Sequence, residues 1–383
     1  MNREVAIIGV GWSGYRSITP ELSYKELMFE AAAKAYAEAG VDPRKDIDGF
    51  VTTAEDLYEG TSIFDEYVPD QLGAVHRPVH TITGDGLHGL AAAYMQIATG
   101  LMDVVALEAH SKASNILTLP YITAFAMDPI FNRPLAAHPD FIAGMDMMRF
   151  MAETGTSIWE CASVVAKNKQ NAMLNPLAAW PASVDIADVL ESAPVAMPLT
   201  RMQIADHADG AIVMVLADGQ TARALSEMPV WVRGLGWAND TPTLESRLWG
   251  QAVYATLAGE MAYRTAGIRS PRSEIDFAEI DDTFAYKELQ HLEALGLCDL
   301  GQAGSWTAAG GTELTGEFPV NPSGGCLGCG QLLDASGLAR ALEIVLQLRG
   351  EAGPRQLEGV ETGLAFAWRG VPTTSGVAAI LSN

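Results

Sequence analysis

Residues 320–337 read VNPSGGCLGCGQLLDASG, a glycine-rich turn that leads into a helix pattern from Ser336 to Leu348. Glycine lets the backbone take the left-handed conformations that tight turns need. A second glycine-rich turn, Gly84-Asp85-Gly86, opens a helix pattern that ends near Gly100. One such turn in each half of the chain, each leading into a helix, predicts an internally duplicated α/β fold.

Strand-like and helix-like runs alternate outward from these two turns. Ser23 and Glu26 form a capping box for a helix over Tyr24 to Ala39, and Gly40 ends it. Strands are predicted at Val5 to Val10, Asp103 to Ala109, Ala211 to Leu216, Val230 to Trp237, Ile275 to Ile280, Gly359 to Phe366 and Val377 to Leu381, and a further helix at Tyr286 to Leu297.

The pattern loosens between about residues 112 and 200, where Met and Pro are abundant and a helix is expected only near Thr156 to Asn171. We interpret this stretch as an insertion that lies over the core. The predicted organisation is therefore an N-terminal half of residues 1–228, which contains the insertion, and a C-terminal half of residues 229–383.

The charge balance excludes two classes of partner. With 24 Lys and Arg against 47 Asp and Glu, the formal net charge is −23, which disfavours nucleic acid and anionic membrane surfaces. A composition of 49% hydrophobic and 19% charged residues is typical of a compact globular protein. No signal-peptide core and no apolar run of membrane-spanning length is found, so we expect a soluble cytoplasmic protein.

Two motifs suggest cofactors, and neither has the context that it needs. Gly9-Val-Gly11-Trp-Ser-Gly14 matches the dinucleotide-binding pattern, but the next helix begins only after Ser23 instead of at once. Cys326 and Cys329 supply two metal ligands at most, and neither Cys161, Cys298 nor the seven histidines complete a set. The sequence predicts no metal and no resident cofactor.

Residues 78–100, PVHTITGDGLHGLAAAYMQIATG, followed by Asp103-Val-Val, resemble the thiolase superfamily, in particular its sterol-carrier-type and archaeal members. In those proteins the nucleophilic cysteine stands at the start of this helix, where backbone amides and the helix dipole favour a thiolate. An ungapped alignment places Thr83 at the cysteine position, and a small shift offers only Gly84, Asp85 or Gly86. The resemblance therefore excludes an acyl-cysteine intermediate at this turn.

The other catalytic positions of the family also differ here. Residues 320–337 resemble its NPSGG…GHPxGATG segment, with Gln331 in place of the histidine. Residues 280–289 resemble its HDCF motif, with Asp281 for the histidine and Thr283 for the cysteine, whereas Asp282 and Phe284 match. The last loop, residues 363–370, contains no second cysteine. Gln331 can donate to an oxyanion, but it cannot shuttle protons. Claisen chemistry is not expected.

The resemblance implies a five-layered αβαβα thiolase fold with two duplicated halves and an inserted loop domain, in a homodimer. Coenzyme A would enter only as part of an acyl-CoA substrate. Residues 197–211 resemble the segment that joins the halves in the family, and we expect them to be structural.

Three functions fit these departures. The first is a lyase, similar to superfamily members that cleave steroid side chains on CoA by a retro-aldol step and work with a small OB-fold, zinc-ribbon subunit. The second is an acyltransferase with a displaced nucleophile, for which only Cys329 is available. The third is a non-catalytic acyl-CoA-binding subunit of a larger complex.

For the lyase, the sequence assigns residues to two groups. The catalytic candidates are Tyr286, Asp281 and Cys329 as base or proton relay, and Gln331 as oxyanion donor. Tyr286 is included because it follows Asp282 by four residues and so shares its helix face. The candidates for binding the substrate are Thr83, Gly84, Asp85, Gly86, His88, Asp282, Gly330 and Gly370.

Overall fold

The computed structural model describes residues 3–60, 64–370 and 374–383. Within these residues, nine strands form one mixed sheet in the order β3-β2-β4-β7-β1-β8-β11-β10-β9, and β5 pairs with β6 separately. The strands are β1 (Val5–Arg16), β2 (Gly49–Thr53), β3 (Val79–Ile82), β4 (Val104–Lys112), β5 (Pro194–Ala196), β6 (Leu199–Thr200), β7 (Asp209–Asp218), β8 (Val230–Asn239), β9 (Phe277–Ile280), β10 (Thr362–Trp368) and β11 (Ser375–Ser382).

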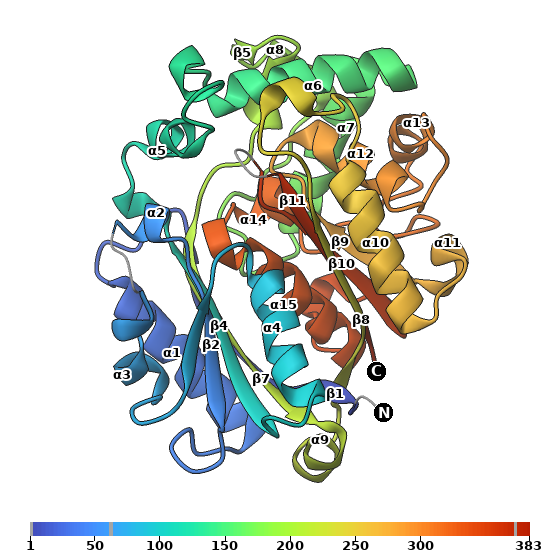
Figure 1. Ribbon diagram of the computed structural model, residues 1–383. Helices are drawn as coiled ribbons and strands as arrows, with labels where there is room; N and C mark the ends of the chain where they lie inside the picture. Colours follow the sequence, from blue (N-terminus) through green and yellow to red (C-terminus); the bar gives the residue numbers. More distant parts are fainter. Residues whose placement is uncertain (1–2, 61–63, 371–373) are drawn as a thin grey trace.

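The helices lie on the faces of the sheet and in the insertion (Figure 1). They are α1 (Tyr24–Ala39), α2 (Asp56–Glu59), α3 (Pro69–Leu72), α4 (Gly86–Ala98), α5 (Leu119–Ala126), α6 (Pro139–Thr154), α7 (Ile158–Ala172), α8 (Ile186–Glu191), α9 (Gly219–Leu225), α10 (Val253–Ala266), α11 (Pro271–Glu274), α12 (Ala285–Ala294), α13 (Ala303–Ala308), α14 (Gly325–Cys329) and α15 (Ser336–Arg349). Within the described ranges, no helix is both long enough and apolar enough to cross a bilayer.

The two halves of the sheet repeat one topology, which confirms the predicted duplication. In the first half, β1 is antiparallel to β7, β7 is antiparallel to β4, and β4 is parallel to β2. In the second half, β8, β11, β10 and β9 follow in the same order with the same directions. The halves meet where Ala6 and Ile7 of β1 pair with Trp231 and Val230 of β8. The predicted division at residue 228 falls between α9 and β8 and stays a prediction.

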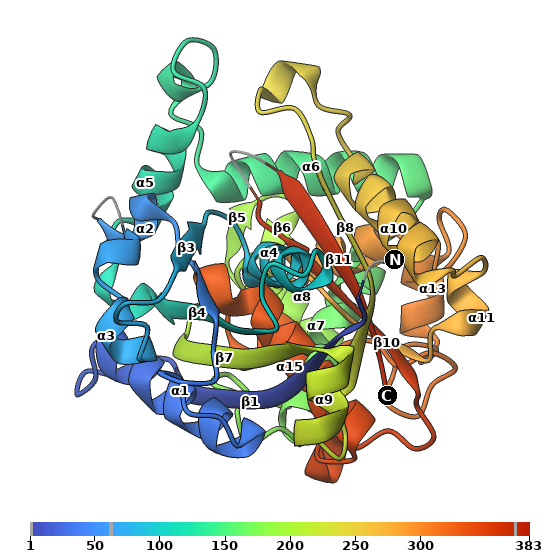
Figure 2. The ribbon, with the colours of Figure 1, turned by 60° about the horizontal axis from the view of Figure 1, so that its bottom comes forward.

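The layers follow from the alternation of side chains along the strands. Val5 and Ile7 of β1 pack into a central core with α4 and α15, whereas Ala6 and Ile8 pack against α1. A third core holds α10 and α12 against the outer face of the second half. Figure 2 shows α1 and α10 on opposite sides of the molecule. The layers are, in order, α1, the first half of the sheet, α4 with α15, the second half of the sheet, and α10 with α12. This is the five-layered arrangement that was expected.

Two of the three glycines of residues 9–14, Gly9 and Gly11, allow helix α1 to pack closely against β1. A β-carbon at Gly11 would lie 2.1 Å from the carbonyl oxygen of Ala31 in α1. In the second half, a β-carbon at Gly236 of β8 would lie 2.1 Å from the carbonyl oxygen of Ala258 in α10. A close approach of helix to strand at equivalent places thus accounts for this motif, which supports rejecting the dinucleotide site.

The insertion holds more helix than the sequence indicated. Between β4 and β7 it contains α5, α6, α7 and α8, and the single predicted helix is α7. The prediction missed α6 because Pro139 and several Met residues obscure its pattern, although a proline in the first turn is compatible with a helix. In Figure 1 the insertion covers the ends of the strands at the top of the molecule.

Candidate functional site

A cleft of about 410 Å³ opens between the insertion and the carboxyl ends of the parallel strands β9 and β10. Such a volume is in the usual range for a small-molecule site. The walls come from seven places along the chain: Tyr58 of α2, α5, residues 138–140, residues 201–207, residues 283–284, residues 331–333 and residues 368–370. In α/β proteins the carboxyl ends of the strands are the usual location of a binding site.

Gln331 lines this cleft, as does Gly370 at the end of β10. The backbone amide of Gln331 donates to the carbonyl of Asp206 (2.8 Å), and its carbonyl accepts from the amide of Ala208 (3.0 Å). These two bonds form a bridge between Gln331 and His207, residues that are far apart in the sequence. The candidate oxyanion donor is therefore fixed beside a histidine.

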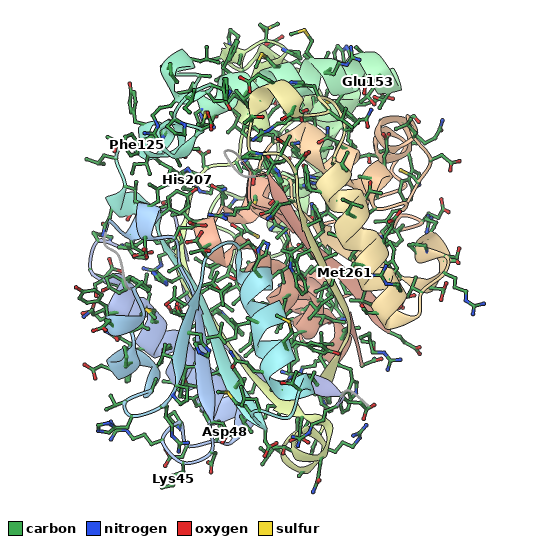
Figure 3. The ribbon with its side chains drawn as sticks, viewed as in Figure 1. Lys45, Asp48, Phe125, Glu153, His207 and Met261 are labelled. Carbon is green, nitrogen blue, oxygen red and sulfur yellow. The ribbon has the colours of Figure 1, made fainter. Side chains whose placement is uncertain are left out.

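His207 also lines the cleft, although no catalytic role was predicted for it from the sequence. Figure 3 shows it below α5 and above the level of α2. Desolvation lowers the pKa of the ring, while Asp206 and a hydrogen bond to the backbone of Gln331 oppose this shift. At neutral pH His207 is thus a neutral imidazole, which can accept a proton. The only sequence signal was its place in Asp206-His-Ala-Asp209-Gly, a segment interpreted as structural.

Tyr286 lies in a separate cavity of about 40 Å³, which we call the aromatic cavity, lined among others by Asp146, Tyr254, Tyr286, Lys287 and Trp368. Its hydroxyl donates to Oδ2 of Asp146 (3.0 Å), and Lys287 Nζ lies 2.9 Å from the same oxygen. Burial and the Asp146 carboxylate raise the pKa of Tyr286 well above its usual value. The phenol stays protonated, and Phe284 and Trp368, which line both spaces, separate it from the cleft.

Asp281 is the acidic half of a buried ion pair. Its Oδ2 lies 2.7 Å from Nη2 of Arg340 in α15, and both side chains are at most 3% exposed. The backbone amide of Thr283 donates to Oδ1 of Asp281 (3.0 Å). These contacts connect the end of β9 to the central helix layer. They also occupy both carboxylate oxygens of Asp281, which would have to be free if Asp281 were the catalytic base.

Asp282 holds the short helix α14 in place. It accepts from the backbone amides of Cys326 (2.6 Å) and Leu327 (3.1 Å) and from the side chain of Asn168 (2.8 Å). Burial and the nearby Glu288 raise the pKa of its carboxyl to about 7. A β-carbon at Gly325 would lie 2.2 Å from the carboxylate oxygen Oδ2 of Asp282, so the glycine at this position leaves room for Asp282.

Cys329 is enclosed in a third space, of about 30 Å³, lined in part by Glu279, Cys326, Gly330 and Glu343. Its thiol donates to the carbonyl of Ser323 (3.1 Å) and accepts from the side chain of Asn175 (3.3 Å). Burial, followed by the charges of Glu279 and Glu343, raises the pKa of the thiol. Cys329 is consequently a thiol at neutral pH. It is not among the residues that line the cleft described above, so it does not face a substrate bound there.

Asp85 organises the turn at residues 83–86, where the sequence resemblance predicted the family's nucleophile position. Its carboxylate accepts from the amide of Leu87 (2.9 Å) at the start of α4 and from the amide of Gly337 (2.8 Å) in α15. The ring of His88 accepts from the amide of Asp85 (3.2 Å), and burial lowers its pKa to about 4. Thr83 is exposed, and Gly84 and Gly86 are buried. None of these residues is among those that line the cleft.

The predicted constellation is thus divided by the structure. Of the twelve residues assigned from the sequence, the cleft brings together Gln331 and Gly370, while Tyr286, Cys329 and Gly330 line smaller spaces and Asp281, Asp282 and Asp85 hold elements together. The expectation that Tyr286, Asp281 and Cys329 face one substrate is not met by this geometry. Their chemical roles stay predictions.

The turn at residues 83–86 should not become acylated. Thr83, the residue of this turn with a hydroxyl group, is exposed, and the amide at the start of α4 already binds the Asp85 carboxylate. The turn therefore contains no activated nucleophile. We expect incubation with acetyl-CoA or acetoacetyl-CoA, followed by peptide mass spectrometry, to show no acyl group on this peptide. A stable acyl group on Thr83 would contradict the interpretation.

Metal ligands and free cations are both scarce at the site. Across the described residues, no group of three or more His, Cys, Asp or Glu side chains could hold a metal ion. The two arginines that line the cleft are ion-paired, Arg201 with Asp206 and Arg369 with Glu55. A phosphate-bearing substrate would have to compete with these carboxylates, or find cations on another chain.

Comparisons with known proteins point to one superfamily. Residues 238–383 match the family model "Thiolase C-terminal domain-like". The chain is 30% identical to an acetyl-CoA acetyltransferase of Methanothermobacter thermautotrophicus, over 99% of this chain and 98% of the relative. It is 28% identical to the 17-hydroxy-3-oxo-4-pregnene-20-carboxyl-CoA lyase of Mycobacterium tuberculosis, over 98% of both chains.

Among solved structures, the Ltp2-ChsH2(DUF35) aldolase superposes with a TM-score of 0.85 at 25% identity, covering 99% of this chain and 97% of the other. The names of the relatives therefore include both acyl-transfer and lyase activities, and the name of one similar structure includes a DUF35 protein.

Proposed function

The chain belongs to the thiolase superfamily, and on this basis we propose that it is a carbon–carbon lyase that cleaves a β-hydroxyacyl-CoA by a retro-aldol step. The observation that carries the proposal is the absence of an activated thiol among the described residues of the site. Residues 83–86, where the resemblance places the nucleophile, contain no cysteine, and Cys329 is a buried thiol outside the cleft. A retro-aldol cleavage needs a base and an oxyanion donor but no nucleophile.

We assign these two tasks to neighbours in the cleft. His207 takes the proton from the β-hydroxyl group, and the β-carbon becomes a carbonyl as its bond to the α-carbon breaks. The electron pair of that bond forms the enolate of the thioester, whose oxygen accepts a hydrogen bond from the Gln331 amide. Protonation of the α-carbon then releases an acyl-CoA and a ketone or aldehyde. The bridge between His207 and Gln331 supports this pairing.

The substrate and the assembly follow the lyase relatives. We propose a steroid-type acyl group, a homodimer, and a small DUF35-type partner subunit, since the aldolase of similar structure pairs its thiolase-like chain with a DUF35 protein. Both arginines that line the cleft, Arg201 and Arg369, are already ion-paired. The partner subunit would therefore also supply the cations that a phosphate-bearing substrate needs.

Acyl transfer is the competing function, because an acetyltransferase is 30% identical to this chain. The structure favours the lyase, since burial raises the pKa of Cys329 and the thiol is bonded to a backbone carbonyl. Acyl transfer requires a thiolate, and at Cys329 burial together with the charges of Glu279 and Glu343 outweighs the opposing effect of Arg355, so the thiol form is favoured.

The test is to co-express the chain with the DUF35 protein encoded nearest to its gene and to supply a steroid-type β-hydroxyacyl-CoA without free CoA. The proposal predicts a carbonyl product and a shortened acyl-CoA in equal amounts, because retro-aldol cleavage consumes no CoA. Cleavage of β-ketoacyl-CoA only, and only with free CoA, would establish acyl transfer instead. A complex that binds acyl-CoA and cleaves neither substrate would indicate a non-catalytic subunit.

A further inference from the structure

Residues 116–138, which we call the α5 arm, form the most apolar exposed part of the insertion. Six large side chains of the arm are at least 61% exposed: Leu117, Tyr121, Phe125, Ile130, Phe131 and Leu135. Figure 2 shows α5 projecting away from the body of the molecule, and Figure 3 shows Phe125 at its outer edge. Large apolar side chains exposed together on one segment indicate a site of interaction.

The arm has two faces with different tasks. Leu117, Tyr121 and Phe125 follow one another at intervals of four residues and lie on the outer face, where Leu117 is 92% exposed and Tyr121 77%. Leu119, Pro120 and Thr123 line the cleft. A molecule that covers the outer face would therefore hold the wall of the cleft from behind.

Charge indicates what kind of molecule fits this surface. Residues 113–127 contain no Asp, Glu, Lys or Arg, and the rest of the arm carries one acid, Asp128, and one base, Arg133, so the arm has no net charge. The guanidinium of Arg133 lies over the ring of Phe125, 4.2 Å from its centroid. The neighbouring α2, which contacts α5, carries the exposed Asp56, and Glu66 lies exposed beyond it. The whole chain carries a net charge of −23, so a second copy would bring the same charge to this surface. A protein with an apolar face edged by Lys and Arg is complementary.

We propose that the outer face of the α5 arm is the docking surface for the small DUF35-type partner, and that docking fixes the cleft wall formed by α5. This inference rests on the proposed function for the identity of the partner. Tyr121 and Phe125 are the expected anchors, because large aromatic side chains contribute most of the binding energy at such interfaces. Asp56 and Glu66 would face basic residues at the edge of the partner.

The test compares two double variants of the full chain for binding to the co-expressed DUF35 protein. Tyr121→Ser with Phe125→Ser removes the outer apolar face, and Leu101→Ser with Leu300→Ser removes two equally exposed side chains elsewhere, 71% and 77% exposed. We expect the arm variant to raise the Kd at least about tenfold, as for interface anchors, and the control variant to leave it unchanged. Raising the salt concentration should weaken wild-type binding, because the edges are charged.

Several outcomes would overturn the docking surface. An arm variant that binds as wild type, or a wild-type chain that binds no DUF35 protein, contradicts it. Loss of the wild-type oligomer in the arm variant, measured by light scattering, would assign the surface to a second copy. Failure of the proposed function gives a different result: the wild-type complex then forms through the arm but cleaves no β-hydroxyacyl-CoA.

Discussion

His207→Gln should lower the rate of β-hydroxyacyl-CoA cleavage by about 10²–10⁴-fold, the usual loss when a general base is removed. Glutamine keeps a hydrogen-bonding side chain at the place next to Gln331, but it cannot accept a proton. The measurement is kcat for the complex with its partner. His138→Gln is the matched control, since His138 also lines the cleft but contacts Asp140 (3.5 Å) and caps α6. We expect the control to retain activity.

The pH dependence of the wild-type enzyme gives an independent check. His207 acts in its neutral form, and desolvation lowers its pKa from the ordinary value of about 6.5. Because the pKa is lowered, kcat/KM should stay constant as the pH falls from neutral through 6.5, and should decrease only below it. A decrease that already begins above the ordinary histidine pKa, or a fully active His207→Gln, would remove His207 from the mechanism.

Arg340→Leu should lower the free energy of unfolding by about 3–5 kcal/mol, because it leaves the Asp281 carboxylate buried without its counter-charge. Arg16→Leu is the matched control. Arg16 pairs with Glu21 at a distance of 3.4 Å, but both side chains are more than half exposed, so about 0–1 kcal/mol is expected. Urea unfolding at neutral pH measures both changes.

A second substitution separates the ion pair from simple loss of packing. Asp281→Asn in the Arg340→Leu background removes the uncompensated charge and should recover part of the stability. An Arg340→Leu variant as stable as the Arg16→Leu control would show that Asp281 is not held by this pair, and would make it available again as a base.

The fold could be predicted because its signals are local and periodic. The capping box of Ser23 and Glu26 and the final Gly40 define α1, and the structure shows the same helix from Tyr24 to Ala39. Buried strands and two glycine-rich turns sufficed to predict the duplication. The helices of the insertion were missed where proline and methionine weaken the apolar period, as at Pro139 in α6.

The site could be predicted only in part, because tertiary contacts decide which groups meet. Gln331 was found through its place in residues 320–337. Tyr286 lies in the first turn of α12, but Asp282 precedes this helix, so the predicted common helix face is wrong. Spacing also could not show that Asp146, from the distant α6, would reach the Tyr286 hydroxyl. His207 is held at the cleft by a backbone bridge to Gln331, a contact between distant residues that no local sequence pattern could predict. Asp281 likewise gave no sign of its ion pair with Arg340.

The decisive measurement is the rate at which Cys329→Ala, in complex with its partner, cleaves a β-hydroxyacyl-CoA in the absence of free CoA. The substitution removes the thiol that acyl transfer would require, together with its bond to the carbonyl of Ser323 (3.1 Å). The lyase mechanism predicts the wild-type rate and equal amounts of carbonyl product and acyl-CoA. A variant that remains folded and in complex but forms no carbonyl product, or an acyl group found on Cys329 of the wild type during turnover, would contradict it.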